Sequence, residues 1–370
     1  MQNPFNYFSI ATDNNFCNRD KDIELLKKYI LNSSNVVLFS KRRYGKTTLI
    51  KEVLKNHLPK SIYKVYIDLY GIQDKYDFIQ RLSLEISKLY SVGDIKQTLL
   101  NLKNIFTKIS FSLTINQKTA MPEIKPEFIK KDFQLLLDEL LDGFVNFLDT
   151  NNKKAVIAMD EFQEILNIKE IDIEAILRTK IQYHKNVSYI FTGSKQHLLT
   201  NMFNNNKKPF YAMSTNFELK PIDEDIFFEY SKKRFKLKDI TLTKEIFSNI
   251  YNLCDKETRA ILKICYELFE HNKNSTINNK ILDNIIEMIN LQNDSVYRLL
   301  SDTLTTNQII VLKIIANEYK EILSLEISKK YNISIQSIKS AINSLMKKEL
   351  LYKNENKYIV YDKEFDFWLK

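Results

Sequence analysis

Short apolar segments alternate with longer segments of helical periodicity over the first part of the chain. Five segments, near 35–39, 64–70, 155–160, 188–193 and 216–220, are predicted strands. Those at 35–39 and 155–160 are apolar runs typical of buried strands, and the one at 216–220 ends just before Pro221. Helical segments separate them, and this alternation is typical of βαβ units built around a central parallel sheet. Sheets of this class bind their ligands at the carboxyl ends of the strands, so the residues that follow each strand are the first candidates for chemistry.

A long insertion, residues 71–150, separates the second of these strands from the third. The insertion is helical in period at both ends. In its middle, residues 109–115 alternate between polar and apolar side chains, and two prolines follow. This pattern predicts a β-hairpin that projects from the sheet. Such a hairpin could bind a partner or could be an insertion that packs on the sheet, and the sequence favours neither alternative.

The pattern changes after residue 222. Residues 223–298 are wholly helical in period, which predicts a helical bundle. Three further helices, near 306–317, 324–331 and 335–348, precede a short hairpin that ends at Tyr361. Helices followed by a hairpin in this order are typical of a winged helix.

The first strand runs into a loop that contains Gly45-Lys46-Thr47, and a helical segment follows. Strand, loop and helix in this order predict a P-loop, whose backbone amides and helix N-terminus bind phosphate. We expect Lys46 to reach the β- and γ-phosphates of ATP and the Thr47 hydroxyl to bind Mg²⁺. Ser40 stands where the full pattern has glycine, and we interpret it as a tolerated variant because serine is also small. The candidate nucleotide-binding residues of this segment are Ser40, Lys41, Arg42, Arg43, Tyr44, Gly45, Lys46, Thr47 and Thr48.

Two acidic residues end the third strand. Asp160 could hold the metal ion, and Glu161 could polarise the attacking water as a general base. Gln163 could help to position that water, or it could be a surface residue. The fourth strand ends in a Thr-Gly-Ser sequence whose polar side chains could sense the γ-phosphate, and of Thr192 and Ser194 we favour Ser194. The predicted catalytic residues are therefore Lys46, Glu161 and Ser194, and the predicted metal ligands are Thr47 and Asp160.

Composition narrows the class of protein. A formal net charge of +9 favours an anionic partner, although the excess of lysine over arginine could also come from an AT-rich genome.

Three cysteines without ligand spacing argue against a disulfide framework and a zinc site, and they favour a reducing cytoplasm. No apolar run approaches the ~18 residues of a membrane helix, and the start of the chain does not resemble a secretion signal. We therefore expect a cytoplasmic protein that does not enter a membrane.

Several short motifs follow one another in the order found in the archaeal-type P-loop ATPase family, which the chain resembles over nearly its whole length. These motifs are Asn3-Pro4-Phe5, Phe16–Asp20, Lys41–Thr47, Met159–Gln163, Phe191–Ser194, Pro209–Tyr211 and Tyr361–Leu369. The family is related to the STAND and AAA+ NTPases, and its layout is similar to that of the origin-recognition initiators.

The resemblance implies ATP binding and hydrolysis, with Arg19 near the adenosine, a helical lid and a winged-helix domain. It also implies switching coupled to assembly, which makes a homo-oligomer a candidate state. Three departures from the family are Ser40 in place of the first glycine, Met213 where relatives often carry arginine, and Asp255–Arg259 in place of a Gly-x-Pro signature in the lid. The second departure leaves a trans-acting arginine unidentified, and the third leaves Arg259 as the candidate lid residue that reaches the γ-phosphate.

The third helix of the predicted winged helix has one apolar stripe, so its polar side chains face outward. Those side chains could read base edges of double-stranded DNA, and lysines of the hairpin could bind its phosphates. The candidate nucleic-acid-binding residues are Gln336, Lys339, Ser340, Asn343, Lys353 and Lys357. Residues 301–370 hold 11 lysines against 9 acidic residues, so this module is not strongly basic. A winged helix that binds a protein is therefore the alternative.

The predicted fold class is α/β: a P-loop NTPase core of the AAA+/ASCE type, with helices on both faces of a parallel sheet, followed by a helical lid and a winged helix. The predicted domains are 1–34 (an N-terminal segment with the first helix), 35–222 (the ATPase core with its insertion), 223–298 (the lid) and 299–370 (the winged helix). The leading hypothesis is a switch that hydrolyses Mg-ATP slowly, is stimulated by a partner or by assembly, and binds double-stranded DNA. The alternative is a STAND-like regulatory ATPase of signalling or defence whose C-terminal domain binds a protein.

Overall fold

The computed structural model describes residues 2–17, 19–90, 99, 101–103, 105–106, 109–115, 122–128, 132–272, 275–317, 321–354 and 357–370. The chain forms two compact units. One unit is Ile10–Ile222, and the other combines the N-terminal segment as far as Ser9 with Asp223–Lys370. The expected segment 1–34 is thus divided between the two units.

Five parallel strands form the sheet of the unit Ile10–Ile222, in the order β2–β5–β6–β1–β7. The strands are β1 (Val36–Phe39), β2 (Ile62–Asp68), β5 (Lys154–Asp160), β6 (Val187–Thr192) and β7 (Thr215–Glu218). This result confirms the parallel α/β core expected from the apolar segments. In this order β6 lies between β1, the strand of the phosphate-binding loop, and β5, the strand that ends in Asp160.

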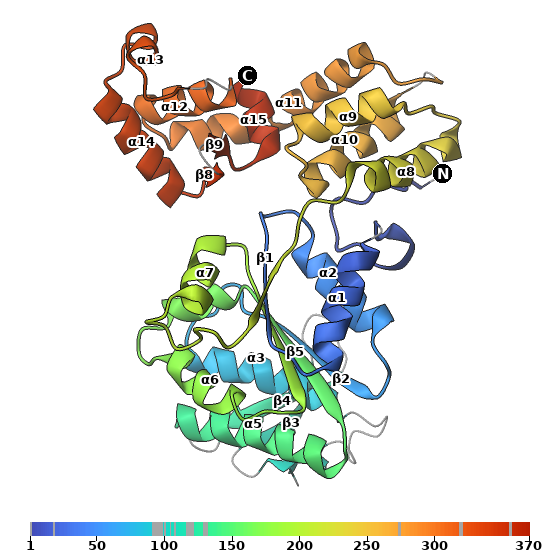
Figure 1. The fold of residues 1–370 in the computed structure, drawn as a ribbon, viewed down its shortest axis with the longest axis vertical. Helices are drawn as coiled ribbons and strands as arrows, with labels where there is room; N and C mark the ends of the chain where they lie inside the picture. Colours follow the sequence, from blue (N-terminus) through green and yellow to red (C-terminus); the bar gives the residue numbers. More distant parts are fainter. Residues whose placement is uncertain are drawn as a thin grey trace. The chain divides into compact units, whose positions relative to one another are not determined.

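The side chains of the strands alternate between two apolar layers. Val36 and Leu38 of β1 pack with α1 and α2 on one face, while Val37 packs with α3, α5, α6 and α7 on the other (Figure 1). The described helices of this unit are α1 (Asp20–Leu31), α2 (Lys46–Glu52), α3 (Lys75–Lys88), α5 (Phe133–Thr150), α6 (Ile173–Ile181) and α7 (Gln196–Asn204), with the short helices η1 (Asp13–Asn15), η2 (Val53–His57) and η3 (Phe162–Asn167). Helices on both faces exclude water from the sheet, as an all-parallel sheet requires.

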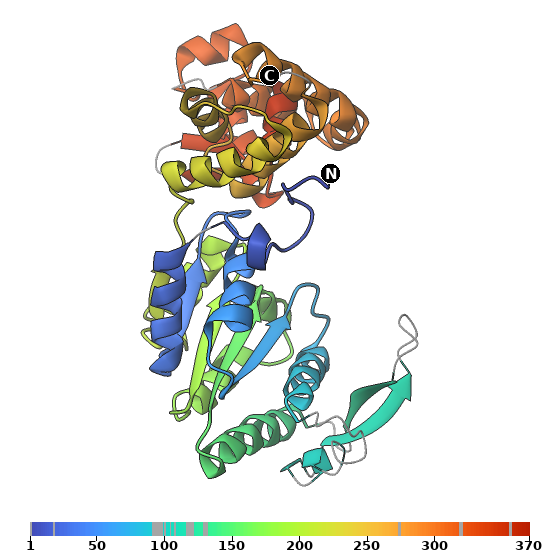
Figure 2. The ribbon, with the colours of Figure 1, turned by 90° about the vertical axis from the view of Figure 1, so that its right-hand side faces the viewer.

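The expected hairpin is present in the insertion. Strands β3 (Ile109–Ile115) and β4 (Pro122–Phe128) pair antiparallel, with Ile109 opposite Phe128. Figure 2 shows this hairpin extending away from the sheet, beyond α3. Phe111, Ile124 and Phe128 pack partly buried against the apolar layer that α3 and α5 also cover. Whether the hairpin binds a partner stays a prediction.

The second unit contains the helical region and the winged helix. Its helices and strands are α8 (Glu224–Phe235), η4 (Lys236–Lys238), α9 (Lys244–Leu253), α10 (Thr258–His271), α11 (Asn279–Asp302), α12 (Thr306–Ala316), α13 (Leu325–Lys330), α14 (Ile335–Lys347), β8 (Leu351–Asn354), β9 (Lys357–Val360) and α15 (Lys363–Leu369). The order from α12 to β9 confirms the winged helix. Phe5 of the N-terminal segment packs against Phe235 and Phe269, which explains why this segment belongs to the second unit. Among the residues that the structure describes, no helix has both the length and the apolar character needed to cross a membrane.

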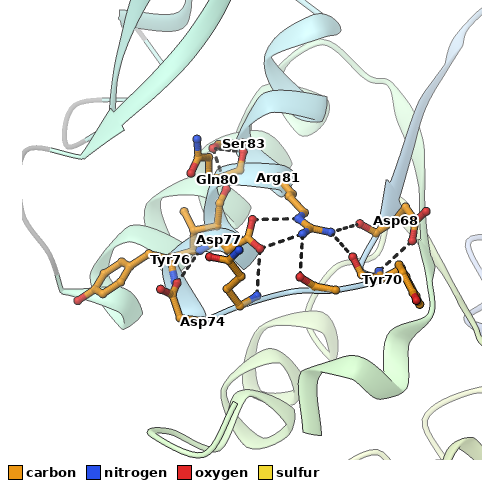
Figure 3. A network of polar contacts seen from close by, with 11 residues as sticks. Asp68, Tyr70, Asp74, Tyr76, Asp77, Gln80, Arg81 and Ser83 are labelled. Carbon is orange, nitrogen blue, oxygen red and sulfur yellow. Dashed lines mark hydrogen bonds and ion pairs between the residues drawn. The ribbon is translucent and has the colours of Figure 1, made fainter. Parts of the chain in front are cut away.

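A polar network supports the end of β2, next to the end of β5. The guanidinium group of Arg81 on α3 pairs with the carboxylate of Asp77 through two 2.9 Å contacts (Figure 3). It also donates to the backbone carbonyls of Asp68 and Tyr70, both at 2.9 Å. The next residue after β2, Leu69, donates its N–H to the Asp160 carbonyl. Arg81 therefore holds the chain that leaves the sheet beside the candidate metal ligand.

The replacement Arg81→Ala should lower the free energy of unfolding of this unit by about 1–2 kcal/mol, because charged hydrogen bonds to backbone carbonyls are lost at a partly exposed site. Urea denaturation followed by far-UV circular dichroism measures the change. The single tryptophan, Trp368, lies in the other unit, so its fluorescence gives an internal reference that should not move.

Arg178→Ala is the matched control, since the Arg178 guanidinium donates to the exposed side chain of Gln182 on the surface of α6. We expect a change within about 0.5 kcal/mol for this control. Equal effects of the two replacements would show that the Arg81 network does not stabilise the end of β2.

Candidate active site

The loop between β1 and α2 has two residues in the left-handed region of backbone space. Arg43 has φ 64° and Gly45 has φ 88°. A φ near 90° is unfavourable for any residue with a Cβ atom, so position 45 requires glycine. Ser40 lies outside this region, is buried, and donates its hydroxyl to the Lys41 carbonyl at 2.7 Å. Serine therefore replaces the first glycine of the pattern without backbone strain.

The ammonium group of Lys46 folds back over this loop. Its Nζ lies 3.4 Å from the Ser40 carbonyl oxygen, 3.3 Å from the Ser40 hydroxyl and 3.5 Å from the Lys41 carbonyl oxygen. Burial lowers the pKa of Lys46 to about 8, while the carboxylates of Glu161 and Asp160 act in the opposite direction. Phosphate oxygens at the N-terminus of α2 would give this buried cation a stronger anionic partner.

Asp160, the last residue of β5, meets the start of α2. The Thr47 hydroxyl donates to Asp160 Oδ2 at 2.6 Å, and the Tyr66 phenol donates to the same oxygen at 2.8 Å. Hydroxyl and carboxylate oxygens suit Mg²⁺, which takes one or two protein ligands and completes its shell with phosphate and water. No group of three or more His, Cys, Asp or Glu that could hold a metal occurs among the described residues. The donor set therefore fits a metal ion that arrives with a nucleotide.

Glu161 follows Asp160 in a left-handed conformation, with φ 51°. Its Oε2 accepts hydrogen bonds from the Ser194 backbone N–H at 3.1 Å, from the Ser194 hydroxyl at 2.8 Å and from the Gln163 side-chain amide at 2.5 Å. Ser194 reaches Glu161 because β6 pairs directly with β5. Thr192, the other candidate sensor, is fully buried. The structure thus brings the predicted general base and the favoured sensor into direct contact.

Gly193 makes room for Gln163. A Cβ atom at position 193 would lie 1.8 Å from Gln163 Oε1 and 2.9 Å from its Cδ. Gln163 is 2% exposed, so its amide is fixed inside the site rather than lying on the surface, which decides between the two interpretations left open by the sequence. Because the other end of the same amide holds Glu161, the small size of Gly193 helps to set the position of the carboxylate.

Arg19, which we expect near the adenosine, forms hydrogen bonds with backbone carbonyls around the site. Its guanidinium donates to the Tyr44 carbonyl at 2.8 Å and to the Lys220 carbonyl at 2.9 Å, and it pairs with Asp22 at 3.0 Å. Arg19 is 7% exposed. These contacts connect the start of α1, the phosphate-binding loop and the segment after β7, so Arg19 restrains the loop through its carbonyl groups.

The other predicted nucleotide-binding residues differ in burial. Tyr44 is buried, Arg42 is exposed, and Lys41, Arg43 and Thr48 are partly buried. Arg42 also acts as a like charge that lowers the pKa of Lys46. The lid candidate Arg259 lies in the first turn of α10, in the second unit.

In the winged helix, Ile338, Ala341, Ile342 and Leu345 of α14 are buried, as the apolar stripe predicts. The side chains proposed for DNA contact are all exposed, and they are Gln336, Lys339, Ser340 and Asn343 on α14, with Lys353 and Lys357 on β8 and β9. With one face of α14 in the core, the opposite face is exposed to solvent.

The chain can now be compared with known proteins. A sequence profile described as an ATPase domain predominantly from Archaea matches residues 16–264, more than half of the chain. The chain belongs to this archaeal-type ATPase family. A second profile, described as a probable winged helix domain, matches residues 295–370.

The chain is similar in sequence to one relative and in fold to several solved structures. An uncharacterized ATP-binding protein of Methanocaldococcus jannaschii is 29% identical over 160 residues, which are 42% of this chain and 38% of that protein, so the match spans about two fifths of the relative. The Walker-type ATPase PABY2304 of Pyrococcus abyssi has a TM-score of 0.64 at 17% identity, over 99% of both chains. The ORC2 protein of Aeropyrum pernix, in ADPNP–ADP complexes, has a TM-score of 0.55 at 13% identity, over 100% of this chain and 96% of that one. At these identities the likeness shows the fold alone: a parallel core, a helical region and a winged helix.

Sequence reasoning missed Tyr66 and the contact that makes Gly193 necessary. Tyr66 lies inside the apolar β2 segment, where a tyrosine gives no signal of a polar role. Gly193 stands in the Thr-Gly-Ser sequence after the fourth strand, but its close approach to Gln163 joins residues far apart along the chain, which a local pattern does not reveal.

The replacement Gly193→Ala should lower the rate of ATP hydrolysis by about 10²-fold and leave nucleotide affinity nearly unchanged. The new methyl group displaces the Gln163 amide and with it the Glu161 carboxylate, and a misplacement of about 1 Å has this typical effect. Phosphate release and fluorescent-nucleotide binding measure the two quantities.

Gly143→Ala on α5 is the control, because the added Cβ meets Phe106 at 3.3 Å, away from the site. Wild-type turnover in Gly193→Ala protein would mean that Gln163 does not set the position of Glu161.

Proposed function

We propose that this ATPase binds Mg-ATP at the 40–48 loop, hydrolyses it, and uses the nucleotide state to control the binding of its winged helix to double-stranded DNA. One observation carries the catalytic part: Lys46, the Thr47–Asp160 pair and Glu161 lie together at the carboxyl edge of one parallel sheet. Membership of an ATPase family supports phosphoryl transfer to water, and the residues gathered at this edge of the sheet support the same chemistry.

Each side chain has a distinct part in this reaction. Lys46 turns from the loop carbonyls to the β- and γ-phosphates and neutralises charge that develops there. Thr47 and Asp160 would hold Mg²⁺, which supplies positive charge next to the phosphates. Glu161 accepts a hydrogen bond from the attacking water and takes up its proton as general base. Lys46 acts on the phosphates and Glu161 acts on the attacking water. Loss of Lys46 should therefore affect nucleotide binding, and loss of Glu161 should affect hydrolysis.

Ser194 connects the γ-phosphate to the general base. Its hydroxyl and N–H both donate to Glu161 Oε2. A γ-phosphate oxygen offers a stronger, fully charged acceptor for the same donors, so its arrival would release Glu161 toward the water. Hydrolysis then removes that acceptor, and the hydrogen bonds to Glu161 form again.

The replacements Lys46→Ala and Glu161→Gln separate binding from chemistry. Lys46→Ala should abolish detectable nucleotide binding, whereas Glu161→Gln should bind ATP and hydrolyse it ~10²–10⁴-fold more slowly, the usual contribution of a general base. Equilibrium binding and single-turnover phosphate release measure these effects.

Glu170→Gln is the matched control, since Glu170 is an exposed acid after η3 that pairs with Lys75 at 2.8 Å. Normal turnover in the Glu161→Gln protein, or equal loss in both glutamate variants, would remove Glu161 from the role of general base.

The distribution of charge in the winged helix supports a DNA partner. The α15 acids point into the unit: Glu364 pairs with Lys263 at 3.6 Å and Asp366 with Lys363 at 3.1 Å. Both acids are nearly buried, so they contribute little to the exposed surface. The exposed lysines of α13, α14 and the hairpin are Lys329, Lys330, Lys339, Lys347, Lys353 and Lys357. The exposed surface is thus more basic than the sequence total suggests.

A protein partner is the second candidate function, and exposed apolar side chains favour it. Leu325 at the start of α13 is 70% exposed and Met346 on α14 is 39% exposed. Apolar groups at these positions suit a protein surface better than a phosphate backbone. This would be the STAND-like regulatory alternative.

Salt dependence separates the two candidates. With Glu161→Gln protein, fluorescence anisotropy of duplex DNA should show affinity that depends on Mg-ATP and falls with salt, with a log–log slope of about −0.9 for each phosphate contact. Replacing Lys353 by Gln should reduce the slope by about 1, and Lys313→Gln on the exposed side of α12 should leave it unchanged.

No binding of DNA with or without Mg-ATP, by protein that still holds ATP, would contradict the DNA proposal and favour the protein partner.

A further inference from the structure

Tyr66 lies on β2, the strand next to β5, and its side chain contacts the candidate metal ligand Asp160. In the parallel pair β2–β5, Tyr66 is in register with Ala158, two residues before Asp160. Its phenol reaches forward and donates to Asp160 Oδ2 at 2.8 Å, the oxygen that also accepts the Thr47 hydroxyl at 2.6 Å. Tyr66 therefore contacts a candidate metal ligand without belonging to either nucleotide motif.

The Asp160 carboxylate is held on both of its oxygens. Oδ2 accepts from Thr47 and Tyr66, and Oδ1 accepts from the Glu161 backbone N–H at 3.0 Å. Asp160 is 4% exposed, so water can contribute little to its solvation. These donors fix the plane of the carboxylate and decide which lone pairs remain directed toward a metal ion or its bound water.

Packing fixes the Tyr66 ring as well. The ring packs partly buried in the apolar layer formed by α1 and α2, and the Lys51 ammonium of α2 lies 4.6 Å from its centroid. A phenol is ordinarily neutral near pH 7, so Tyr66 donates its O–H to the Asp160 carboxylate. A rigid, neutral donor suits a buried carboxylate that must keep its own negative charge for a cation.

We propose that Tyr66 is a positioning residue, which orients Asp160 so that the Thr47–Asp160 pair can accept the metal ion of a bound Mg-nucleotide. This inference rests on the proposed function and adds a residue to it. Tyr66 does not touch the reacting atoms. Loss of the Tyr66 hydroxyl should therefore reduce the gain in nucleotide affinity that Mg²⁺ causes, and it should leave the affinity without Mg²⁺ unchanged.

The test compares the affinity for a fluorescent, non-hydrolysable ATP analogue in EDTA and in saturating Mg²⁺, on the full chain. In wild-type protein Mg²⁺ should strengthen binding. In Tyr66→Phe protein the affinity in EDTA should stay the same, while the gain from Mg²⁺ should fall ~10-fold or more, the usual effect of removing a hydrogen-bond partner of a metal ligand. Phenylalanine keeps the ring and its packing, so the folded state is retained.

Two controls make the result specific. Tyr63→Phe changes the same strand on the opposite face, where Tyr63 packs against Phe147, and should leave the gain from Mg²⁺ unchanged. In an Asp160→Asn background, adding Tyr66→Phe should cause no further loss, because the two residues act through one hydrogen bond.

An equal loss of affinity in EDTA and in Mg²⁺ would mean that Tyr66 has a structural role alone, and a further loss in the Asp160→Asn background would mean that it acts independently of Asp160. Either result overturns the inference while the proposed function stands. Wild-type protein that binds no nucleotide would overturn both.

Discussion

Parallel pairing of β5, β6 and β1 determines where the candidate site can form. The carboxyl ends of these strands meet at one edge, and each end carries a different group: the phosphate-binding loop, the Asp160–Glu161 pair and Ser194. The insertion of β6 between the other two brings Ser194 within 2.8 Å of Glu161. Without the direct pairing of β6 with β5, Ser194 would not lie next to Glu161. The apolar layers on both faces of the sheet therefore support the chemistry by keeping this order fixed.

Buried polar groups at this edge are held by partners that a nucleotide can replace. Lys46 rests on two carbonyls and a hydroxyl at 3.3–3.5 Å, long contacts for a buried cation. Glu161 receives three donors that also suit a phosphate. Such arrangements stabilise the protein less than an apolar core would, and they are expected where binding supplies the missing interactions. Arg19 and Arg81 belong to a different class, because their hydrogen bonds to backbone carbonyls hold the frame around the site.

The sequence was sufficient to predict the elements that have a strong local signal. The predicted strands lie within two residues of the observed ones. β1 and β5 are apolar runs with a strong signal, whereas β7 is largely polar, and Gly45-Lys46-Thr47 marks the loop. The parallel sheet follows from the alternation of strand and helix segments, whereas the order of its strands has no local signal.

Contacts that depend on register could not be predicted in the same way. Tyr66 reaches Asp160 because β2 pairs with β5 in a register that places Tyr66 opposite Ala158, two residues before Asp160, and the sequence has no signal for that register. The resemblance places Arg19 near the adenosine, which stays a prediction, and it gives no sign that the Arg19 guanidinium donates to the Tyr44 and Lys220 carbonyls. Burial of Gln163 under Gly193 depends in turn on the path of η3. Each of these facts concerns residues that are distant along the chain, where local pattern carries no information.

A crystal structure of the Glu161→Gln protein with ATP and Mg²⁺ tests the central claim most directly. The account predicts phosphates against the N-terminus of α2, with Lys46 Nζ moved from the Ser40 carbonyl to the β- and γ-phosphates and the metal ion bound by the Thr47 hydroxyl beside Asp160. A nucleotide bound away from the 40–48 loop, with Lys46 still on the loop carbonyls, would contradict it.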